Sequence, residues 1–156
     1  MKSFMIIGMG RFGHYLCREL SALGNEILAV DVVEEQLEPC LSLVTSAQIG
    51  DCTRQEVLQE LGVRNFDACF VCIGTNFQNS LEITSLLKEM GAKKVVSRAS
   101  TDVQAKFLLR NGADEVVYPE RDIAERIAKK SSANHVFDFV DLGAYGIYEV
   151  LPLKSW

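Results

Sequence analysis

Short hydrophobic runs recur along this chain, and longer amphipathic segments separate them. The runs have the length of β-strands and lie at residues 3–8, 26–31, 46–50, 68–73, 94–98 and 115–118. Between the runs, hydrophobic residues recur every three or four positions, as on one face of a helix; one such set is Ile83, Leu86, Leu87 and Met90. This alternation predicts a parallel sheet with helices on both faces and right-handed crossovers.

The residues at the ends of the helical segments support this prediction. Four segments are followed by a glycine, where a left-handed cap is common: Gly24, Gly62, Gly91 and Gly112. Thr53-x-x-Glu56 and Thr101-x-x-Gln104 are patterns of capping boxes, which begin helices. Pro119 stands where the first turn of a last helix tolerates proline.

The predicted fold class is α/β, a Rossmann-like, doubly wound sheet of six parallel strands in the order 3-2-1-4-5-6. The domain is predicted to cover residues 1–132. Residues 133–156 alternate hydrophobic and polar positions and contain Gly143 and Gly146. We expect this segment to be a linker and the beginning of a further β-rich region, too short for a core of its own. It either docks on the first domain, joins a partner chain or belongs to a longer protein.

The first hydrophobic run ends in Gly-x-Gly-x-x-Gly, formed by Gly8, Gly10 and Gly13. In a strand–loop–helix unit, the first glycine permits a tight turn, the second lets the backbone approach a pyrophosphate, and the third lets helix and strand pack closely. The helix that follows presents unpaired N–H groups and its positive dipole end to the phosphates. Asp31 ends the second run and is predicted to accept hydrogen bonds from ribose hydroxyls.

This pattern predicts a site for an adenine nucleotide at the carboxyl ends of the strands. The negative charge of Asp31 disfavours a 2′-phosphate, so NADP is not expected. NAD, ATP and ADP carry the same free ribose hydroxyls, and the sequence does not distinguish between them.

Composition and charge exclude several other classes of protein. The chain has 156 residues, a net charge of −5 and a pI near 5.1, which argues against a nucleic-acid partner. No hydrophobic run approaches the length of a membrane span. The N-terminal run passes directly into the glycine loop without the features of a signal peptide, so we expect a cytoplasmic protein.

The five cysteines are expected to be free and mostly buried thiols; they are Cys17, Cys40, Cys52, Cys69 and Cys72. Cys69-x-x-Cys72 has the spacing of a redox or zinc motif. Both residues lie in one predicted strand, however, and residues three apart on a strand point to opposite faces. We therefore do not expect these two sulfur atoms to meet.

Polar residues at the predicted strand ends are further candidates for ligand contact. Arg11, inside the glycine loop, either binds phosphate oxygens in a bidentate manner or is a solvated surface residue. Asp51 suits a contact with adenine or ribose and equally a capping turn, and Arg98 either faces the phosphates or pairs with a surface acid. Glu120 suits the dipole of a helix start, and His14 is expected to be solvated.

An NAD-dependent dehydrogenase would need a substrate domain and a proton-transferring residue beside the nicotinamide. The sequence contains no Tyr-x-x-x-Lys pair and no recognisable His–Asp pairing. We therefore predict that the nucleotide is a signal and that the chain is not an enzyme. A small NAD-dependent oxidoreductase is the alternative, and a module that keeps the fold without a ligand is a third hypothesis.

Several motifs together resemble the KTN/RCK domain of potassium-uptake regulatory subunits of the TrkA/KtrA type. Beyond the glycine loop they are Leu28-Ala-Val-Asp31, Gly50-Asp51, Leu61-Gly-Val-Arg-Asn-Phe-Asp67, Ile73-Gly-Thr-Asn76, Gly112-Ala-Asp114 and Tyr118-Pro-Glu-Arg-Asp122. The likeness extends through Leu142. The resemblance also implies a C-terminal RCK_C domain, of which this chain contains only the apparent beginning.

The resemblance implies a cytosolic, peripheral subunit that binds NAD(H) or ATP/ADP and regulates a membrane potassium channel or transporter, without inserting into the membrane. Such domains form homodimers that assemble into an octameric ring, whose shape changes with the nucleotide. The implied cofactor-binding residues are Gly8, Met9, Gly10, Arg11, Phe12, Gly13, Asp31, Val32, Asp51, Cys52, Ile73, Gly74, Thr75 and Arg98.

Within this set, the resemblance implies that the glycines bind the phosphates and that Asp31 binds the ribose. Asp51 and Cys52 would lie at the adenine. Arg11 would reach a terminal phosphate, including one held by a neighbouring subunit. Glu120 corresponds to a position that helps to hold a cation near the nucleotide in some relatives.

Overall fold

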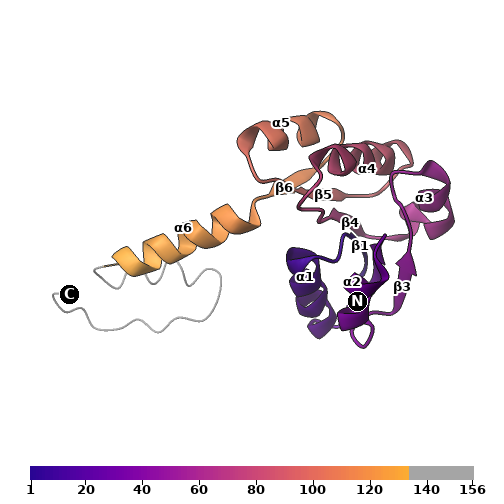
Figure 1. The fold of residues 1–156 in the computed structure, drawn as a ribbon, viewed down its shortest axis with the longest axis horizontal. Coiled ribbons are helices and arrows are strands. Elements are labelled where there is room, and N and C mark those ends of the chain that lie inside the picture. The colour runs from indigo at the N-terminus through magenta and orange to yellow at the C-terminus, as the bar shows by residue number, and fades with distance from the viewer. Residues whose placement is uncertain (134–156) are drawn as a thin grey trace. The chain divides into compact units, whose positions relative to one another are not determined.

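The computed structural model describes residues 1–133, and these form the predicted sheet. Its strands are β1 (Ser3–Ile7), β2 (Glu26–Asp31), β3 (Ser46–Ile49), β4 (Ala68–Val71), β5 (Val95–Arg98) and β6 (Glu115–Val117). All neighbouring strands are parallel, and their order is β3-β2-β1-β4-β5-β6 (Figure 1). The predicted sheet and its strand order are confirmed.

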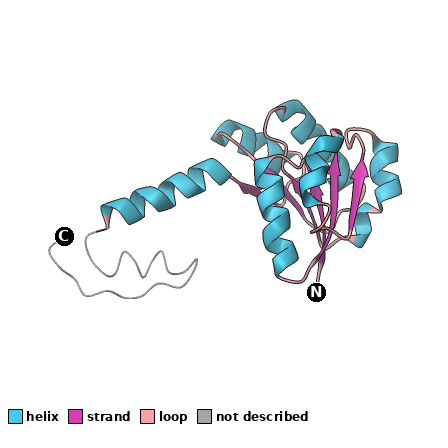
Figure 2. Ribbon diagram, turned by 60° about the horizontal axis from the view of Figure 1, so that its bottom comes forward, coloured by secondary structure: helices cyan, strands magenta, loops and turns pink. Residues whose placement is uncertain are grey.

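Helices connect the strands and cover both faces of the sheet (Figure 2). The connecting elements are α1 (Arg11–Ala22), α2 (Glu34–Leu37), η1 (Glu38–Cys40), α3 (Gln55–Leu61), η2 (Val63–Asn65), α4 (Phe77–Glu89) and α5 (Asp102–Arg110). Each crossover returns the chain to the end of the sheet where the previous strand began, so all strands run in one direction. The loops that follow the strands therefore lie at one end of the sheet, and the loops that precede them lie at the other.

The hydrophobic core lies on both faces of the sheet because successive strand residues point to opposite sides. In β1, Met5 and Ile7 pack in a first core cluster together with α3 and α4. Ile6 lies between them in the chain and packs in a second core cluster with α1, α2 and η1. The sheet is therefore doubly wound, as the alternating pattern predicts.

The same alternation separates the two sulfur atoms of Cys69-x-x-Cys72. Cys69 belongs to the first core cluster and Cys72 to the second, which confirms the prediction. Burial raises the pKa of both thiols to about 12. Both are therefore protonated at neutral pH and are poor nucleophiles.

Side chains at the amino ends of the strands fix how neighbouring strands align. Asp67, the residue before β4, accepts the backbone N–H of Ser3 in β1 at 2.9 Å. Asp114, the residue before β6, accepts the N–H of Val95 in β5 at 2.8 Å. Each carboxylate thus satisfies a strand-end donor of the adjacent strand, and a one-residue slip of the pairing would break the bond.

The helix ends carry most of the predicted signals. Positive φ angles, as left-handed caps require, occur at Gly24, Gly62, Gly91 and Gly112. The hydroxyl of Thr101 accepts the Gln104 N–H at 3.1 Å, and the Gln104 side chain accepts the Ser100 N–H at 2.8 Å, which confirms the capping box at α5. Asn76 caps α4 by accepting the N–H of Asn79 at 3.0 Å.

Contacts between residues divide the chain after Tyr118 into two units. The first contains the sheet and helices α1 to α5. The second contains α6 (Pro119–Ser132), which begins at the predicted proline and has no buried residue. The predicted boundary at residue 132 stays a prediction, and the β-rich region predicted after it lies outside the described residues. In the described part of the chain, no helix combines the length and the hydrophobicity that a bilayer crossing requires.

Candidate nucleotide-binding site

The predicted cofactor-binding residues come from loops that leave the sheet at one edge. Strands β1 to β5 are parallel, so their carboxyl ends and the loops after them meet there. β1 pairs with β2 on one side and with β4 on the other. The loop after β1 is therefore flanked by the loops after β2 and β4, at the position where open α/β sheets bind ligands.

Two glycines of the loop after β1 are required by the fold itself. Gly8 has a φ of 94°, and a Cβ there would lie 3.0 Å from Cγ1 and 3.1 Å from the backbone nitrogen of Ile73. A Cβ on Gly13 would collide with the carbonyl oxygen of Gly8. Gly8 thus forms the turn against the loop after β4, and Gly13 lets α1 approach that turn.

Gly10 has a different environment. Its φ of −73° and ψ of −159° lie in the extended region, which is open to other residues, and a Cβ there would meet no atom within 4 Å outside the adjacent residues. The packing therefore does not require glycine at this position. Open space over the backbone is what the close approach of a pyrophosphate needs.

The N-terminus of α1 lies directly after Gly10 and has no side-chain cap and no acidic residue in its first turn. The first N–H groups of a helix have no acceptor within the helix, and they carry a partial positive charge. Arg11, the first residue of α1, is exposed. This combination suits an anionic group.

Asp31, at the end of β2, connects two of the loops. Its Oδ2 accepts the Met9 N–H at 2.7 Å, and its Oδ1 accepts the Val33 N–H at 2.9 Å. Each carboxylate oxygen can accept two hydrogen bonds. One acceptor position therefore remains on each oxygen, and the predicted bonds from ribose hydroxyls are compatible with this arrangement.

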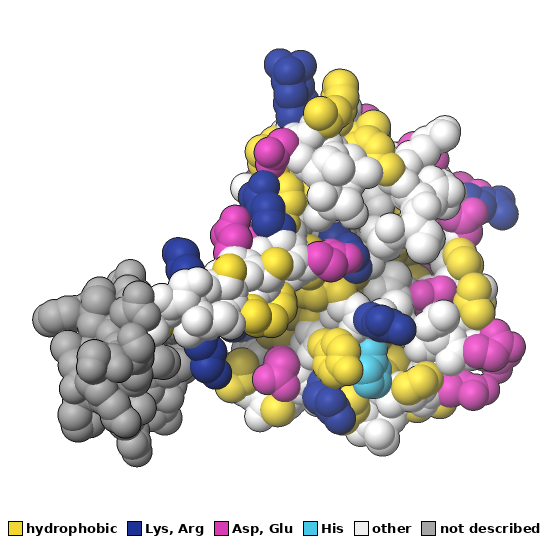
Figure 3. Space-filling model, turned by 60° about the vertical axis from the view of Figure 1, so that its left-hand side comes forward, with side chains coloured by type: hydrophobic (Ala, Val, Ile, Leu, Met, Phe, Trp, Pro, Cys, Tyr) yellow, Lys and Arg dark blue, Asp and Glu magenta, His cyan; other side chains and the backbone are white. Residues whose placement is uncertain are grey.

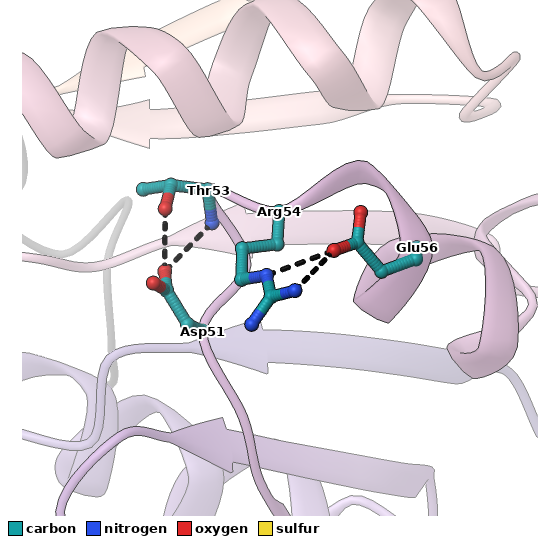
Figure 4. Close-up of polar contacts among 4 residues, drawn as sticks. All are labelled: Asp51, Thr53, Arg54 and Glu56. Atoms are coloured by element: carbon teal, nitrogen blue, oxygen red, sulfur yellow. Dashed lines mark hydrogen bonds and ion pairs between the residues drawn. The ribbon is translucent and has the colours of Figure 1, made fainter.

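The loop after β3 turns on Asp51 (Figure 4). The Asp51 carboxylate accepts the Thr53 hydroxyl at 2.6 Å and the Thr53 N–H at 3.0 Å, and these bonds lower the pKa of Asp51 below its usual value. The capping-turn interpretation of Asp51 therefore describes its contacts in the structure. A contact with adenine or ribose stays a prediction.

The predicted capping box at Thr53 and Glu56 is wrong. α3 has Arg54 as its N-cap residue and receives no side-chain cap. The Thr53 hydroxyl donates its hydrogen bond to the Asp51 carboxylate, and α3 begins one residue later than the pattern predicts. Glu56 instead forms an ion pair with Arg54, in which the Arg54 Nη2 lies 2.6 Å from the Glu56 Oε1 (Figure 4).

Two predicted site residues have buried side chains. Met9 packs in the second core cluster and Cys52 in the first, and each is 2% exposed. Burial, with a smaller effect of the Asp51 charge, raises the pKa of the Cys52 thiol to about 12. A ligand at this edge can therefore reach only the backbone of these two residues.

Arg98 extends from the end of β5 over the loops after β1 and β4. Its guanidinium carbon lies 6.0 Å from the centre of the Phe12 ring, which is the range of cation–π contact. Its Nη1 lies 3.2 Å from the position of a Cβ on Gly74, so the missing side chain of Gly74 makes room for the guanidinium. Arg98 thus adds positive charge beside the glycine loop.

The other predicted residues of this edge are accessible to varying degrees. Val32, which follows Asp31, is 61% exposed, and Thr75 is exposed. The prediction that His14 is solvated is wrong in part. The residue is half-buried, its Nδ1 is buried without a hydrogen-bond partner in the described residues, and its ring packs edge-on against Tyr15.

Glu120 lies near the start of α6, in the second unit, and is exposed. Within residues 1–133, no group of three or more His, Cys, Asp or Glu side chains is arranged to hold a metal ion. The predicted role of Glu120 with a cation stays a prediction.

A separate groove of about 500 Å³ runs along α4. It is lined by Thr53, Leu81, Glu82, Ser85, Leu86, Glu89 and Asn111. None of these is a predicted cofactor-binding residue, so the groove provides an internal comparison for experiments that locate a ligand.

The sequence analysis missed two sets of contacts. The first is the contact between Phe12 and Arg98, and the second is the pair of hydrogen bonds that Asp31 accepts from the Met9 and Val33 N–H groups. A possible signal for the first was the aromatic residue inside the glycine loop, opposite an arginine at the end of strand β5. No sequence signal indicates the second, because any residue except proline supplies an N–H group.

The fold and the glycine loop place the chain among the Rossmann-like domains. More narrowly, residues 4–119 match the TrkA-N domain, and the chain belongs to the TrkA-N family. Ktr system potassium uptake protein C of Bacillus subtilis is 43% identical over 141 residues, which are 90% of this chain and 64% of that protein. Ktr system potassium uptake protein A of the same organism is 40% identical over 155 residues, 99% of this chain and 70% of that protein.

Solved structures support the fold independently. The NAD(P)-binding domain of an exopolyphosphatase-related protein from Archaeoglobus fulgidus superimposes with a TM-score of 0.73 at 24% identity, over 84% of this chain and 98% of that one. The GsuK channel bound to NAD superimposes with a TM-score of 0.71 at 16% identity, over 86% of this chain and 24% of that one.

Proposed function

We propose that this chain is the nucleotide-binding part of a regulatory subunit for potassium uptake and acts on the cytosolic side of a membrane channel or transporter. The observation that carries the proposal is the uncovered backbone at Gly10, directly before a helix N-terminus without an acid in its first turn. Membership of the TrkA-N family and the likeness to two Ktr potassium uptake proteins support the physiological context. The chain spans 64% of the first of these relatives.

The proposed ligand is NAD(H) or ATP/ADP, with the adenosine half at Asp31 and the phosphates at the glycine loop. Arg11, at the start of α1, and Arg98, beside Phe12 and Gly74, supply cations near that loop. Glu34 and Glu35, in the first turn of α2 after Asp31, add negative charge beside the ribose position. Repulsion of a 2′-phosphate supports NAD over NADP.

Regulation requires a ligand that binds two states with different affinity. An additional phosphate can form charge-assisted hydrogen bonds with Arg11 in one arrangement of subunits and not in another. Each such bond contributes roughly 1.5–3 kcal/mol. A few of them, repeated around an assembly, are sufficient to move a two-state equilibrium from mostly one form to mostly the other.

Self-association into dimers and a ring is part of the proposal. Hydrophobic side chains reach the surface at several separate places, among basic and acidic ones (Figure 3). In α6, Ile123 and Ile127 stand one turn apart and are 50% and 58% exposed. Exposed hydrophobic residues at this spacing support contact with another helix.

The proposal is tested by titrating ATP, ADP and NADH into the purified chain while its mass is measured by light scattering. We expect binding of at least one nucleotide and a change in assembly between nucleotides. Absence of binding by all three would refute the proposal.

Arg11→Ala is expected to weaken ATP binding by about tenfold or more and ADP binding by less, since Arg11 is proposed to reach the terminal phosphate. Arg110→Ala, at the exposed C-terminus of α5, is the matched loss of an arginine. An equal effect of Arg11→Ala on both nucleotides would contradict the proposed position of Arg11.

The nucleotide is proposed to act as a signal and not as a reagent. An assay of NADH oxidation over a panel of carbonyl substrates is expected to give no turnover. Sustained turnover would favour the alternative, a small NAD-dependent oxidoreductase.

A cation at Glu120 is a further part of the proposal, and Glu120→Gln is expected to reduce any dependence of ATP affinity on added divalent cation.

A further inference from the structure

The carboxylate of Asp31, the proposed ribose contact, accepts hydrogen bonds from two backbone N–H groups. Its two oxygens accept N–H groups from different segments, Met9 in the glycine loop at 2.7 Å and Val33 after β2 at 2.9 Å. The Asp31 carbonyl accepts the Gly50 N–H at 3.0 Å. One residue therefore contacts the loops after β1, β2 and β3.

The bond to Met9 determines the course of the glycine loop. Gly8, one residue earlier, donates its N–H to the Val30 carbonyl at 2.9 Å, which continues the pairing of β1 with β2. The Met9 N–H then has the Asp31 side chain as its acceptor. The next residue, Gly10, is the one whose uncovered backbone faces the open space, so the Asp31 bond lies directly before the proposed phosphate position.

We propose that Asp31 is a positioning residue for the phosphate-binding loop, in addition to its proposed contact with the ribose. The inference rests on the proposed nucleotide function and deepens it. Asp31 holds the loop in its binding shape before a ligand arrives. A ligand therefore does not bear the full entropic cost of ordering the loop.

The two possible roles of Asp31 predict effects of opposite sign. If Asp31 serves the ribose alone, its removal leaves unchanged or strengthens the binding of an anion that lacks ribose hydroxyls, because a nearby negative charge disappears. If Asp31 positions the loop, its removal weakens the binding of that same anion. The probes are ADP, 2′,3′-dideoxy-ADP and inorganic pyrophosphate.

The experiment measures the dissociation constants of these three probes for the wild-type chain and for Asp31→Ala. We expect Asp31→Ala to weaken dideoxy-ADP and pyrophosphate at least tenfold and ADP by more. Asp31→Asn keeps an acceptor for one of the two N–H groups and is expected to give an intermediate loss. Unchanged or tighter binding of dideoxy-ADP to Asp31→Ala would overturn the inference.

Asp67→Ala is the matched control, because Asp67 also accepts one backbone N–H from a neighbouring strand, at the opposite edge of the sheet. It is expected to leave all three dissociation constants within twofold of wild type. Circular dichroism and thermal unfolding of each variant establish that it is folded under the conditions of the titration.

A second measurement separates failure of this inference from failure of the proposed function. Hydrogen exchange of the Met9 N–H in the ligand-free chain is expected to be at least tenfold faster in Asp31→Ala than in wild type or Asp67→Ala. This readout needs no nucleotide. Equal exchange in all three proteins would overturn the positioning role even if every nucleotide binds, and absence of nucleotide binding would refute the function alone.

Discussion

The three glycines of the loop after β1 should respond differently to alanine. The fold excludes a side chain at Gly13, where a Cβ would collide with the Gly8 carbonyl oxygen. The collision is with backbone, so it cannot be relieved by a change of rotamer. Overpacking of this kind costs typically 1–3 kcal/mol, and we expect Gly13→Ala to lower the free energy of unfolding by about 3 kcal/mol.

Gly10→Ala should leave stability nearly unchanged. Alanine tolerates the backbone angles of Gly10, and a Cβ would touch nothing within 4 Å outside the adjacent residues. Replacing glycine at a compatible position stabilises by about 0.4–1 kcal/mol through the unfolded chain. Alanine is a poorer N-cap than glycine by a similar amount, so the two effects nearly cancel.

The new methyl group of Gly10→Ala would, however, occupy the space through which a pyrophosphate approaches. Losing one charge-assisted hydrogen bond to a phosphate costs about 1.5–3 kcal/mol, or roughly 10- to 150-fold in affinity. Isothermal titration with ADP and urea unfolding, run on both variants, measure the two effects. A Gly10→Ala variant that binds ADP within twofold of wild type would refute the reasoning, because the phosphates would then lie elsewhere.

Three further predictions concern side chains outside the candidate site or buried beneath it. The hydrogen bond from the Ser3 N–H lowers the pKa of Asp67. Burial raises the pKa of Asp114, but the bond from the Val95 N–H and the charge of Lys88 outweigh burial and bring it below the ordinary 3.8. The stability that these two carboxylates contribute is present above pH 4 and is lost as pH falls through their folded pKa values, so Asp67→Asn should flatten the acid limb of a urea-unfolding series. Cys52, Cys69 and Cys72 have pKa values of about 12, so iodoacetamide at pH 8 should label them at least tenfold more slowly in the native chain than in urea; equal rates would contradict their burial. The hydroxyls of Thr84 and Ser97 form a buried hydrogen bond of 2.7 Å, and Thr84→Val should lower the free energy of unfolding by about 1–3 kcal/mol. The double variant Thr84→Val, Ser97→Ala should lose less stability than the sum of the two single losses. Strict additivity of the two losses would show that the hydroxyls do not interact.

Strand and helix assignments were predictable because local sequence and burial agree along most of this chain. Strands that are covered on both faces read as continuous hydrophobic runs, and the runs at residues 3–8 and 26–31 coincide with β1 and β2 within one residue. Glycines with positive φ ended the helices where expected. The strand order followed from the Rossmann pattern.

The contacts of the candidate site were less predictable because they depend on residues that are distant in sequence. From the sequence, the Thr53 hydroxyl could either accept a helix N–H as a cap or donate to the Asp51 carboxylate. Only the folded loop shows that it donates to Asp51. The position of the Arg98 guanidinium depends on the space beside Gly74, which has no side chain, and on the contact with the Phe12 ring. Sequence identifies such residue types but not which of them meet.

The most direct test of the account is an NMR titration of the ¹⁵N-labelled chain with ADP, read at individual backbone N–H groups. We predict saturable shifts at Gly10, Arg11 and Phe12 and at the residues after β2, with no shifts along the α4 groove. Shifts confined to that groove, or none at millimolar ADP, would contradict the claim that the glycine loop binds a nucleotide.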